Sequence, residues 1–312
     1  MENIHKSLAE VKSVAVHDGK FHADEAFAIA ALRLFNPGLE VIRTRDSKEH
    51  KQVDLRVDVC GRYEPNKGDY DHHLVNGPKR ENGIPYASFG MIWKHYGSQI
   101  CEKLLGNAGK EDLARIVLDV DAILVQKIDA DDTGYFSPNE NSKDSPYLLP
   151  RFFSVLNPQW HESGSIDMMF NESVDIAKRI LSREIIRAHS VILARSIIID
   201  ALDKYKGKGY FVLEGTYPWH EVVIEQSLDT KFLVHKGSNS KQWAVTCVPA
   251  ELGTYNYRKK LPLVWAGLRD EQLQNLTGVK DALFCHNGRF TAGAISREGA
   301  IKLAELALES KE

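Results

Sequence analysis

Short apolar runs alternate with longer segments of helical periodicity through the first half of the chain. The run at 13–17 (SVAVH) predicts a buried strand, and the next residues predict a helix over about 23–35, which Asn36-Pro37-Gly38 ends. Further strands are predicted at 39–45, 53–60 and 67–72, and further helices at 86–105 and 111–130. This alternation predicts an α/β domain in which helices cover both faces of a largely parallel sheet.

The second half has a different pattern. Residues 133–160 are rich in Ser, Asn and Pro and predict an irregular connection, whereas 166–202 has apolar positions at the spacing of one helix face. Short strands are then predicted at 210–213, 221–225, 231–235, 243–248 and 280–285, followed by a last helix at about 297–308. The predicted organisation is an N-terminal catalytic domain over 1–165, a connecting helical segment over 166–205 and a smaller α+β domain over 206–312.

Composition changes this picture little. With 43% hydrophobic and 27% charged residues, the 312-residue chain can bury a full core without cross-links. Its four cysteines form no CxxC pair, which argues against a disulfide framework and against a thiolate zinc site. The sequence has neither an apolar signal segment at its start nor an 18-residue apolar run, so we expect a cytoplasmic location and no membrane partner. A net charge of −3 gives no global argument for nucleic acid.

Four clusters of His and Asp fall where predicted elements end. Because the carboxyl ends of parallel strands meet at one edge of a sheet, groups that are distant in the sequence can share a site there. Imidazoles and carboxylates without thiolates suit Mn²⁺, Fe²⁺ or Zn²⁺, whereas all-oxygen sites favour Mg²⁺ or Ca²⁺. The candidate residues are His17, His22, Asp24, Asp58, Asp71, His72, His73 and Asp132.

This number of candidates bears on how many ions are bound. About seven ligands exceed the four that one tetrahedral ion needs. Two ions about 3.5–4 Å apart would use them, with a carboxylate bridging the pair. Such a pair activates a water and clamps the oxygens of a phosphoryl group during in-line attack. The clusters therefore predict a two-metal phosphoesterase.

Each cluster also has a structural interpretation. A single His at a strand end is more often a hydrogen-bonded structural residue, and Asp24 lies where a carboxylate stabilises a helix N-terminus. The acidic residues 129–132, among them Asp129 and Asp131 with no assigned role, could form a solvated helix end. Asp58 is harder to explain in this way, because a carboxylate within an apolar strand is costly unless it is paired or metal-bound.

Two motifs and five longer segments resemble known families. Asp71-His72-His73 is similar to the triplet that names the DHH phosphoesterase superfamily, and 132–136 (DTGYF) is similar to its fourth metal-binding motif. The segments HDGKFHADE, YDHH, YPWHEVVIE, YRKKLPLVWAGL and FCHNGRFTAGA resemble the UPF0160 family, also called the Myg1-type or metal-dependent protein hydrolase family. From their order and spacing, the chain is identified as a member of that family.

The resemblance implies a DHH domain joined by a helix to a smaller C-terminal domain, with the active site between them. It implies that Asp58 bridges two ions and that Asp71 and His72 are the better ligands of the triplet. His73 is then a candidate for contact with the scissile phosphate. Which of His72 and His73 is the metal ligand stays open. The other implied ligands are His17, His22, Asp24 and Asp132.

One departure from the superfamily pattern bears on the metal. His22-Ala23-Asp24 stands where other DHH proteins usually carry Asp-x-Asp. A nitrogen ligand thus replaces an oxygen, which favours Mn²⁺ over Mg²⁺, with Zn²⁺ as a further alternative. Because of the same substitution, the substrate range of better-known DHH nucleases cannot be transferred directly to this chain.

The C-terminal part offers candidates for substrate binding. The segment 286–293 (HNGRFTAG), which begins with His286, resembles the glycine-rich substrate loop of DHH-associated domains. Small residues such as Gly288 let backbone amides approach a phosphate, and Arg289 can bind it bidentately. An ordinary turn is an equally good interpretation. Arg258 could grip a substrate backbone, although a solvated loop is favoured there.

The predicted function is that of a metal-dependent phosphodiester hydrolase, specifically a 3′-5′ exonuclease on RNA or a short oligonucleotide, as described for eukaryotic members of the family. Asp58 and His73 are its candidate catalytic residues, the latter assisting the leaving oxygen. Two alternatives stay open. One is a phosphoesterase for dinucleotides, cyclic dinucleotides or pyrophosphate, which the weak basic charge favours slightly. The other is a non-catalytic, metal-stabilised binding protein. The sequence does not predict an oligomeric state.

Overall fold

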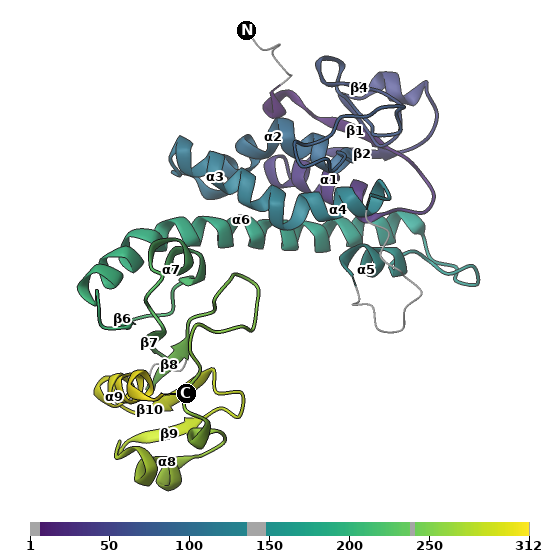
Figure 1. Cartoon of the computed structure of the whole chain (residues 1–312). Helices are drawn as coiled ribbons and strands as arrows, with labels where there is room; N and C mark the ends of the chain where they lie inside the picture. The colour runs from purple at the N-terminus through teal and green to yellow at the C-terminus, as the bar shows by residue number, and fades with distance from the viewer. Residues whose placement is uncertain (1–6, 136–147, 238–240, 312) are drawn as a thin grey trace. The chain divides into compact units, whose positions relative to one another are not determined.

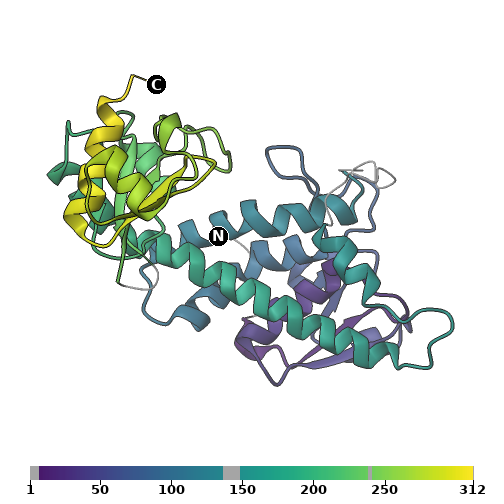
Figure 2. The ribbon, with the colours of Figure 1, turned by 90° about the horizontal axis from the view of Figure 1, so that it is seen from below.

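The computed structural model describes residues 7–135, 148–237 and 241–311. The chain forms two compact units, Met1–His189 and Ser190–Glu312. The long helix α6 (Ile166–Lys204) begins in the first unit and ends in the second (Figures 1 and 2). The division falls inside this helix rather than at its ends, and the domain boundaries at 165 and 205 stay a prediction.

The first unit contains a five-stranded sheet in the order β2-β1-β3-β5-β4. Its strands are β1 (Ser13–Val16), β2 (Glu40–Arg43), β3 (Leu55–Val57), β4 (Tyr63–Glu64) and β5 (Asp69–Tyr70). β1 pairs in parallel with β2 and β3, and β3 pairs in parallel with β5, whereas the short β4 lies antiparallel to β5 at the edge. The prediction of a largely parallel α/β sheet is confirmed. Parallel pairing brings the carboxyl ends of four strands to one edge.

Helices α1 (Ala23–Phe35) and α2 (Ser88–Leu105) pack against each other in this unit (Figure 1). Ten of the thirteen residues of α1 are buried, because its many alanines let neighbouring elements approach closely. Phe27 of α1 contacts both Phe89 of α2 and Phe153 of α5 (Leu149–Val155), with ring centroids 5.5 and 5.1 Å apart. These contacts pack α1 against α2 and α5.

The N-terminus of α2 is anchored by two buried carboxylates. The backbone amides of Ser88 and Phe89 donate to the Oδ2 and Oδ1 atoms of Asp24, at 3.1 and 2.7 Å. The amide of Gly90 donates to Oδ1 of Asp129 at 3.0 Å. These three amides would otherwise lack intrahelical partners. The bonds therefore tie α2 to the first turn of α1 and to α4 (Gln126–Asp132).

Three predicted elements of the first unit differ from the structure. The helix predicted at 111–130 is divided into α3 (Lys110–Val120), a π-helical turn η4 (Asp121–Val125) and α4. The strand predicted at 53–60 is shorter, because Asp58 takes a left-handed backbone with φ 58°. The connection predicted at 133–160 contains α5, and its residues 136–147 lie outside the described part. Short 3₁₀ helices are η1 (Leu8–Glu10), η2 (Glu49–Gln52) and η3 (Pro65–Lys67).

The second unit holds another five-stranded sheet, in the order β6-β7-β8-β10-β9. Its strands are β6 (Tyr210–Leu213), β7 (Phe232–Lys236), β8 (Trp243–Cys247), β9 (Ala282–Cys285) and β10 (Thr291–Ala294), and its helical elements are α7 (His220–Gln226), η5 (Leu263–Trp265), α8 (Asp270–Thr277) and α9 (Arg297–Glu309). Only the pairing of β6 with β7 is parallel among these described strands. The smaller α+β domain is confirmed.

One strand predicted in this unit is wrong. Residues 221–225 belong to α7, which buries Val222 and Val223 against β6 and the end of α6. A short apolar run cannot distinguish a strand from one buried helical turn, because both present neighbouring apolar side chains. In addition, β10 occupies part of the segment that was expected to be a substrate loop.

No helix in the described part of the chain is both long and apolar enough to cross a membrane.

We predict that Gly90→Ala destabilises the first unit. The added Cβ would lie 1.8 Å from Oδ2 of Asp129, so α2 or α4 would have to move. Alanine alone favours a helix by roughly 0.5–1 kcal/mol over glycine, but overpacking costs about 1–3 kcal/mol. A net loss in the free energy of unfolding is therefore expected from urea denaturation.

Gly38→Ala is the matched control, since its Cβ would meet only Asn36 Oδ1 at 3.6 Å. Equal stability of the two variants would contradict the close packing of α2 on Asp129.

Candidate metal centre

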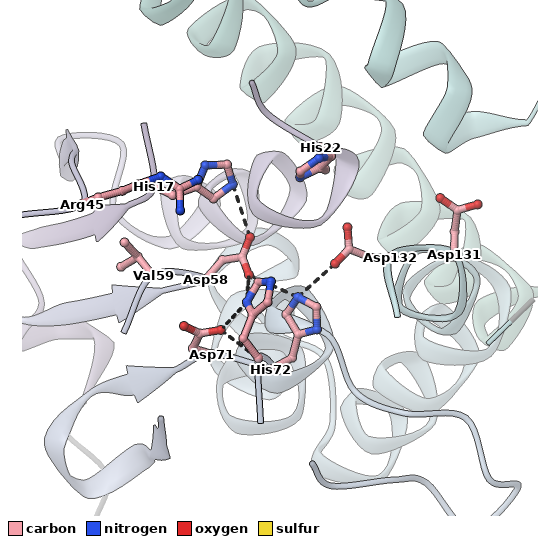
Figure 3. A pocket seen from close by; sticks show the side chains of 10 residues that line it. His17, His22, Arg45, Asp58, Val59, Asp71, His72, Asp131 and Asp132 are labelled. Carbon is pink, nitrogen blue, oxygen red and sulfur yellow. Dashed lines mark hydrogen bonds and ion pairs between the residues drawn. The ribbon is translucent and has the colours of Figure 1, made fainter. Parts of the chain in front are cut away.

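Side chains from four strand ends meet at the carboxyl edge of the first sheet. His17 directly follows β1, Asp58 follows β3 and Asp71 follows β5, whereas Arg45 lies two residues beyond β2. Together with residues from α4 they surround a cavity of about 470 Å³ (Figure 3). The lining residues are His17, His22, Arg45, Asp58, Val59, Asp71, His72, His73, Asp131 and Asp132.

Asp58 lies at the centre of this arrangement (Figure 3). Its carboxylate is 4% exposed and lies 3.4 Å from Nε2 of His17 and 3.2 Å from Nε2 of His72. The hydroxyl of Ser88 donates to its Oδ1 at 3.2 Å. Burial opposes ionisation, but the two histidines outweigh it and hold the pKa of Asp58 below its usual range. The central group is therefore a carboxylate between two imidazoles.

His17 and His72 are held in defined orientations. Nδ1 of His17 lies 2.9 Å from the carbonyl oxygen of Asp18, which directs Nε2 towards Glu25 at 2.9 Å. Nε2 of His72 lies 3.0 Å from Oδ2 of Asp132. Burial lowers the pKa of both histidines, but the carboxylates around them raise it, to about 10 for His17 and about 11 for His72. Surroundings that attract a proton this strongly also attract a metal ion, which has to displace that proton.

The carboxylates carry more negative charge than the protein neutralises. Within the described part of the chain, no Lys or Arg side chain forms an ion pair with Asp24, Asp58 or Asp132. Burial, followed by the charges of Asp132 and Asp58, raises the pKa of Asp24 well above its usual value. Buried carboxylates of this kind require a cation or a proton.

A buried ligand atom without a partner points to the same conclusion. Among the described residues, Oε2 of Glu25 is buried and has no hydrogen-bond partner. Three groups of described side chains have ligand atoms within 4.8 Å of one another. These groups are His17, His22 and Glu25; Asp58, His72 and His73; and Asp24, His72 and Asp132. The donor set of imidazole and carboxylate fits divalent metal ions.

Asp71 has a different environment from the other predicted ligands. Its Oδ1 lies 2.8 Å from Nδ1 of His73 and accepts the backbone amide of the same residue at 3.0 Å. Its Oδ2 accepts the amide of Gly61. Asp71 is in none of the three groups of described ligands. Its contacts hold His73, whose side chain is 66% exposed, beside Asp58 at 3.4 Å.

The structure thus brings the predicted metal residues of the first unit together. His17, His22, Asp58, Asp71, His72 and Asp132 line one cavity, as does His73. Asp24 does not line it but belongs to one group with His72 and Asp132. Whether each is a ligand stays a prediction.

Glu25, Arg45 and Ser88 were not predicted to belong to the site. Glu25 accepts the amide of His22 at 2.9 Å as part of a capping box, and a carboxylate at this helix position is ordinarily explained by capping alone. Arg45 could have been found, because it is the last residue of the strand predicted at 39–45. Ser88 is distant in the sequence, and no local pattern indicates its contact with Asp58.

Asp129 is held by contacts within the fold, whereas Asp131 lines the cavity. Oδ2 of Asp129 lies 2.8 Å from Nη2 of Arg80, and Oδ1 accepts the amide of Gly90. Burial raises the pKa of Asp129 to about 7, although Arg80 and Gly90 oppose this rise. Asp129 therefore anchors α2 rather than lining the cavity.

The predicted substrate residues lie in the second unit. His286 and Gly288 form the turn between β9 and β10, where the amide of Gly288 donates to Nδ1 of His286 at 3.0 Å. Arg289 takes a left-handed backbone, with φ 59°, and donates to the carbonyl of Leu261 at 3.2 Å.

Arg258 also contacts backbone. Its guanidinium group donates to the carbonyl oxygens of Ser227 and Thr230, the latter at 3.1 Å. Burial lowers the pKa of Arg258. The two arginines therefore bind carbonyls of their own unit in this structure.

Comparison with known proteins agrees with the geometry. The model of the uncharacterised protein family UPF0160, also called MYG1 exonuclease, matches residues 13–308. The chain belongs to this family. MYG1 exonuclease of Homo sapiens is 30% identical over 325 residues, which cover 96% of this chain and 86% of the relative. A MYG1 protein of Schizosaccharomyces pombe is also 30% identical, over a match that covers 95% of this chain and 97% of the relative. The predicted family is confirmed.

One solved structure is also similar to this MYG1-family chain. It is a pGpG-specific phosphodiesterase, PggH, from Vibrio cholerae, with 11% identity, a TM-score of 0.31 and coverage of 95% of this chain and 97% of the other. At that TM-score the likeness carries no argument.

We predict that Glu25→Gln weakens binding of divalent metal. The variant removes a buried charge that lies against His17 while keeping the shape of the side chain. A loss of roughly 10–100-fold in affinity is typical when such a partner of a metal site is changed. Calorimetric titration of the metal-free protein with Mn²⁺ measures it.

Glu40→Gln, at the exposed start of β2, is the control. Unaltered Mn²⁺ affinity in Glu25→Gln, with the fold intact by circular dichroism, would exclude Glu25 from the metal centre.

Proposed function

We propose that this protein is a metal-dependent phosphodiester hydrolase, and specifically a 3′-5′ exonuclease on RNA that uses two divalent ions. The observation that carries the proposal is the convergence of the three ligand groups on one cavity around Asp58. The comparisons support a hydrolytic enzyme of the nuclease or phosphoesterase class, since relatives in the family carry the name exonuclease.

The positions of the side chains support two ions rather than one. His17, His22 and Glu25 would hold an ion on one side of Asp58, and Asp24, His72 and Asp132 would hold the other. Asp58 contacts a histidine of each group, His17 at 3.4 Å and His72 at 3.2 Å, which suits a bridging carboxylate. Two bound ions would lower the pKa of a water and offset charge on the phosphoryl oxygens.

His73 is suited to proton transfer. Asp71 holds Nδ1 of its ring, and its exposed side chain faces the cavity. In this orientation His73 can contact the phosphate and donate a proton to the departing oxygen. Asp71 then acts by positioning the ring.

The ligand set also bears on the metal and on the location. The three imidazoles of the two ion groups, those of His17, His22 and His72, lie among carboxylates and favour Mn²⁺, with Mg²⁺ or Zn²⁺ as alternatives. All four cysteines are free, which supports a reducing compartment such as the cytoplasm. The human relative's name supports a nucleic acid substrate.

We expect purified protein with Mn²⁺ to release mononucleotides from single-stranded RNA. RNA labelled at the 5′ end should give a ladder of shortened labelled products, because a 3′-5′ exonuclease removes nucleotides from the other end. Asp58→Asn should reduce kcat/KM by at least about 10³-fold, since the change removes the charge between the two ion sites. Gel electrophoresis of the products measures both.

Asp175→Asn changes an exposed carboxylate of α6 and serves as the control. Immediate release of the 5′ label as a mononucleotide would reverse the proposed polarity. Full activity in Asp58→Asn, or no hydrolysis when the wild-type protein holds two equivalents of metal, would refute the proposed function.

A further inference from the structure

A second pocket opens beside the metal cavity and has a different character. This basic pocket has a volume of about 370 Å³ and lies among η2, the end of β3 and the β4–β5 region. Five of its ten lining residues are Lys or Arg, and one is a carboxylate. The lining residues are Arg45, Ser47, His50, Lys51, Arg56, Val59, Cys60, Arg62, Lys67 and Asp69.

The positive charge of the basic pocket is only partly used by the fold. Asp69 is 2% exposed and binds both Arg56 and Arg62, so one carboxylate faces two guanidinium groups. Arg56 also donates to the carbonyl of Val53 at 2.9 Å and is therefore structural. Lys67 pairs with Glu64, whereas Lys51 is exposed and takes part in no ion pair with another described residue. The pocket thus retains net positive charge that can bind an anion.

The basic pocket and the metal cavity adjoin each other. Arg45 and Val59 line both of them, and Val59 directly follows Asp58 (Figure 3). Arg45 pairs with Asp18 at 3.1 Å, but both side chains are more than half exposed. Such an exposed pair contributes little free energy, so Arg45 can exchange Asp18 for a phosphate.

We propose that the basic pocket binds the phosphates of nucleotides adjoining the scissile bond, so that the substrate is an oligonucleotide rather than a single small phosphoester. This rests on the proposed function, which places the scissile phosphate in the metal cavity. Among the described residues that line the pocket, His50 carries the only aromatic ring, and it is buried and lies 3.1 Å from the carbonyl oxygen of Thr44. The pocket therefore recognises backbone charge and not base identity.

The test uses two charge reversals in neighbouring positions. Lys51→Glu alters the basic pocket, whereas Lys48→Glu changes net charge equally at an exposed residue that does not line it. Fluorescence anisotropy in the presence of Mn²⁺ measures binding of labelled ten-nucleotide and two-nucleotide RNAs that carry hydrolysis-resistant phosphorothioate linkages. Lys51→Glu should weaken binding of the longer RNA roughly tenfold. It should also reduce, by about one, the slope of the logarithm of the binding constant against the logarithm of the salt concentration. Lys48→Glu should have little effect on either quantity.

The outcomes separate the pocket from the proposed chemistry. Equal effects of the two variants, no binding of the longer RNA by wild-type protein, or equal wild-type affinity for the two RNAs would overturn the inference. Binding that depends on Lys51 in a protein that hydrolyses no phosphodiester would instead refute the proposed function alone. If the protein hydrolyses the longer RNA and Lys48→Glu and Lys51→Glu change the rate equally, the role of the basic pocket is refuted and the proposed function stands.

Discussion

Compensation of buried negative charge is the constraint on which the first unit depends. Asp24 and Asp129 are both inaccessible to solvent, and each is met by backbone amides at the start of α2. Asp71 is met by the amide of Gly61 and by His73. Asp58 faces imidazoles and one hydroxyl. The two histidines compensate Asp58, whereas the backbone amides leave the pKa of Asp24 well above its usual value, so a cation near Asp24 would supply compensation that the protein does not.

The same carboxylates are placed by the ends of the strands and by the first turn of α1. The short strands of the parallel sheet end in residues whose side chains enter the cavity, while α1 supplies Asp24 and Glu25 from its first turn. Strand β3 ends where Asp58 takes a left-handed backbone, and the carboxylate of Asp58 there faces His17 and His72. Strand ends and one helix start thus produce a site that no single segment could form.

Much of this arrangement could be predicted from the sequence, because strand periodicity and the positions of His and Asp are local signals. The sheet, its carboxyl edge and the cavity around Asp58 follow from them. The structural role of Asp129 could not be predicted, since it depends on Arg80 and Gly90 across the fold. Local signals also failed at 221–225, where one apolar run suits either a strand or a helical turn.

The residues predicted to bind substrate show a similar limit. Arg258 has the chemistry of a phosphate ligand, yet its guanidinium group binds the carbonyls of Ser227 and Thr230. Side-chain type alone does not distinguish an arginine that serves a ligand from one that closes a loop. That distinction depends on which backbone oxygens the fold leaves nearby.

The double role of Asp24 has a thermodynamic consequence. Its oxygens accept the first amides of α2 and also lie in a ligand group with His72 and Asp132. A cation bound there lowers the free energy of the ionised form of Asp24, which is the form that accepts those amides best. Metal occupancy and the order of the first turn of α2 are therefore linked, and each favours the other by the same free energy. An ion bound there would in this sense also be a part of the folded protein.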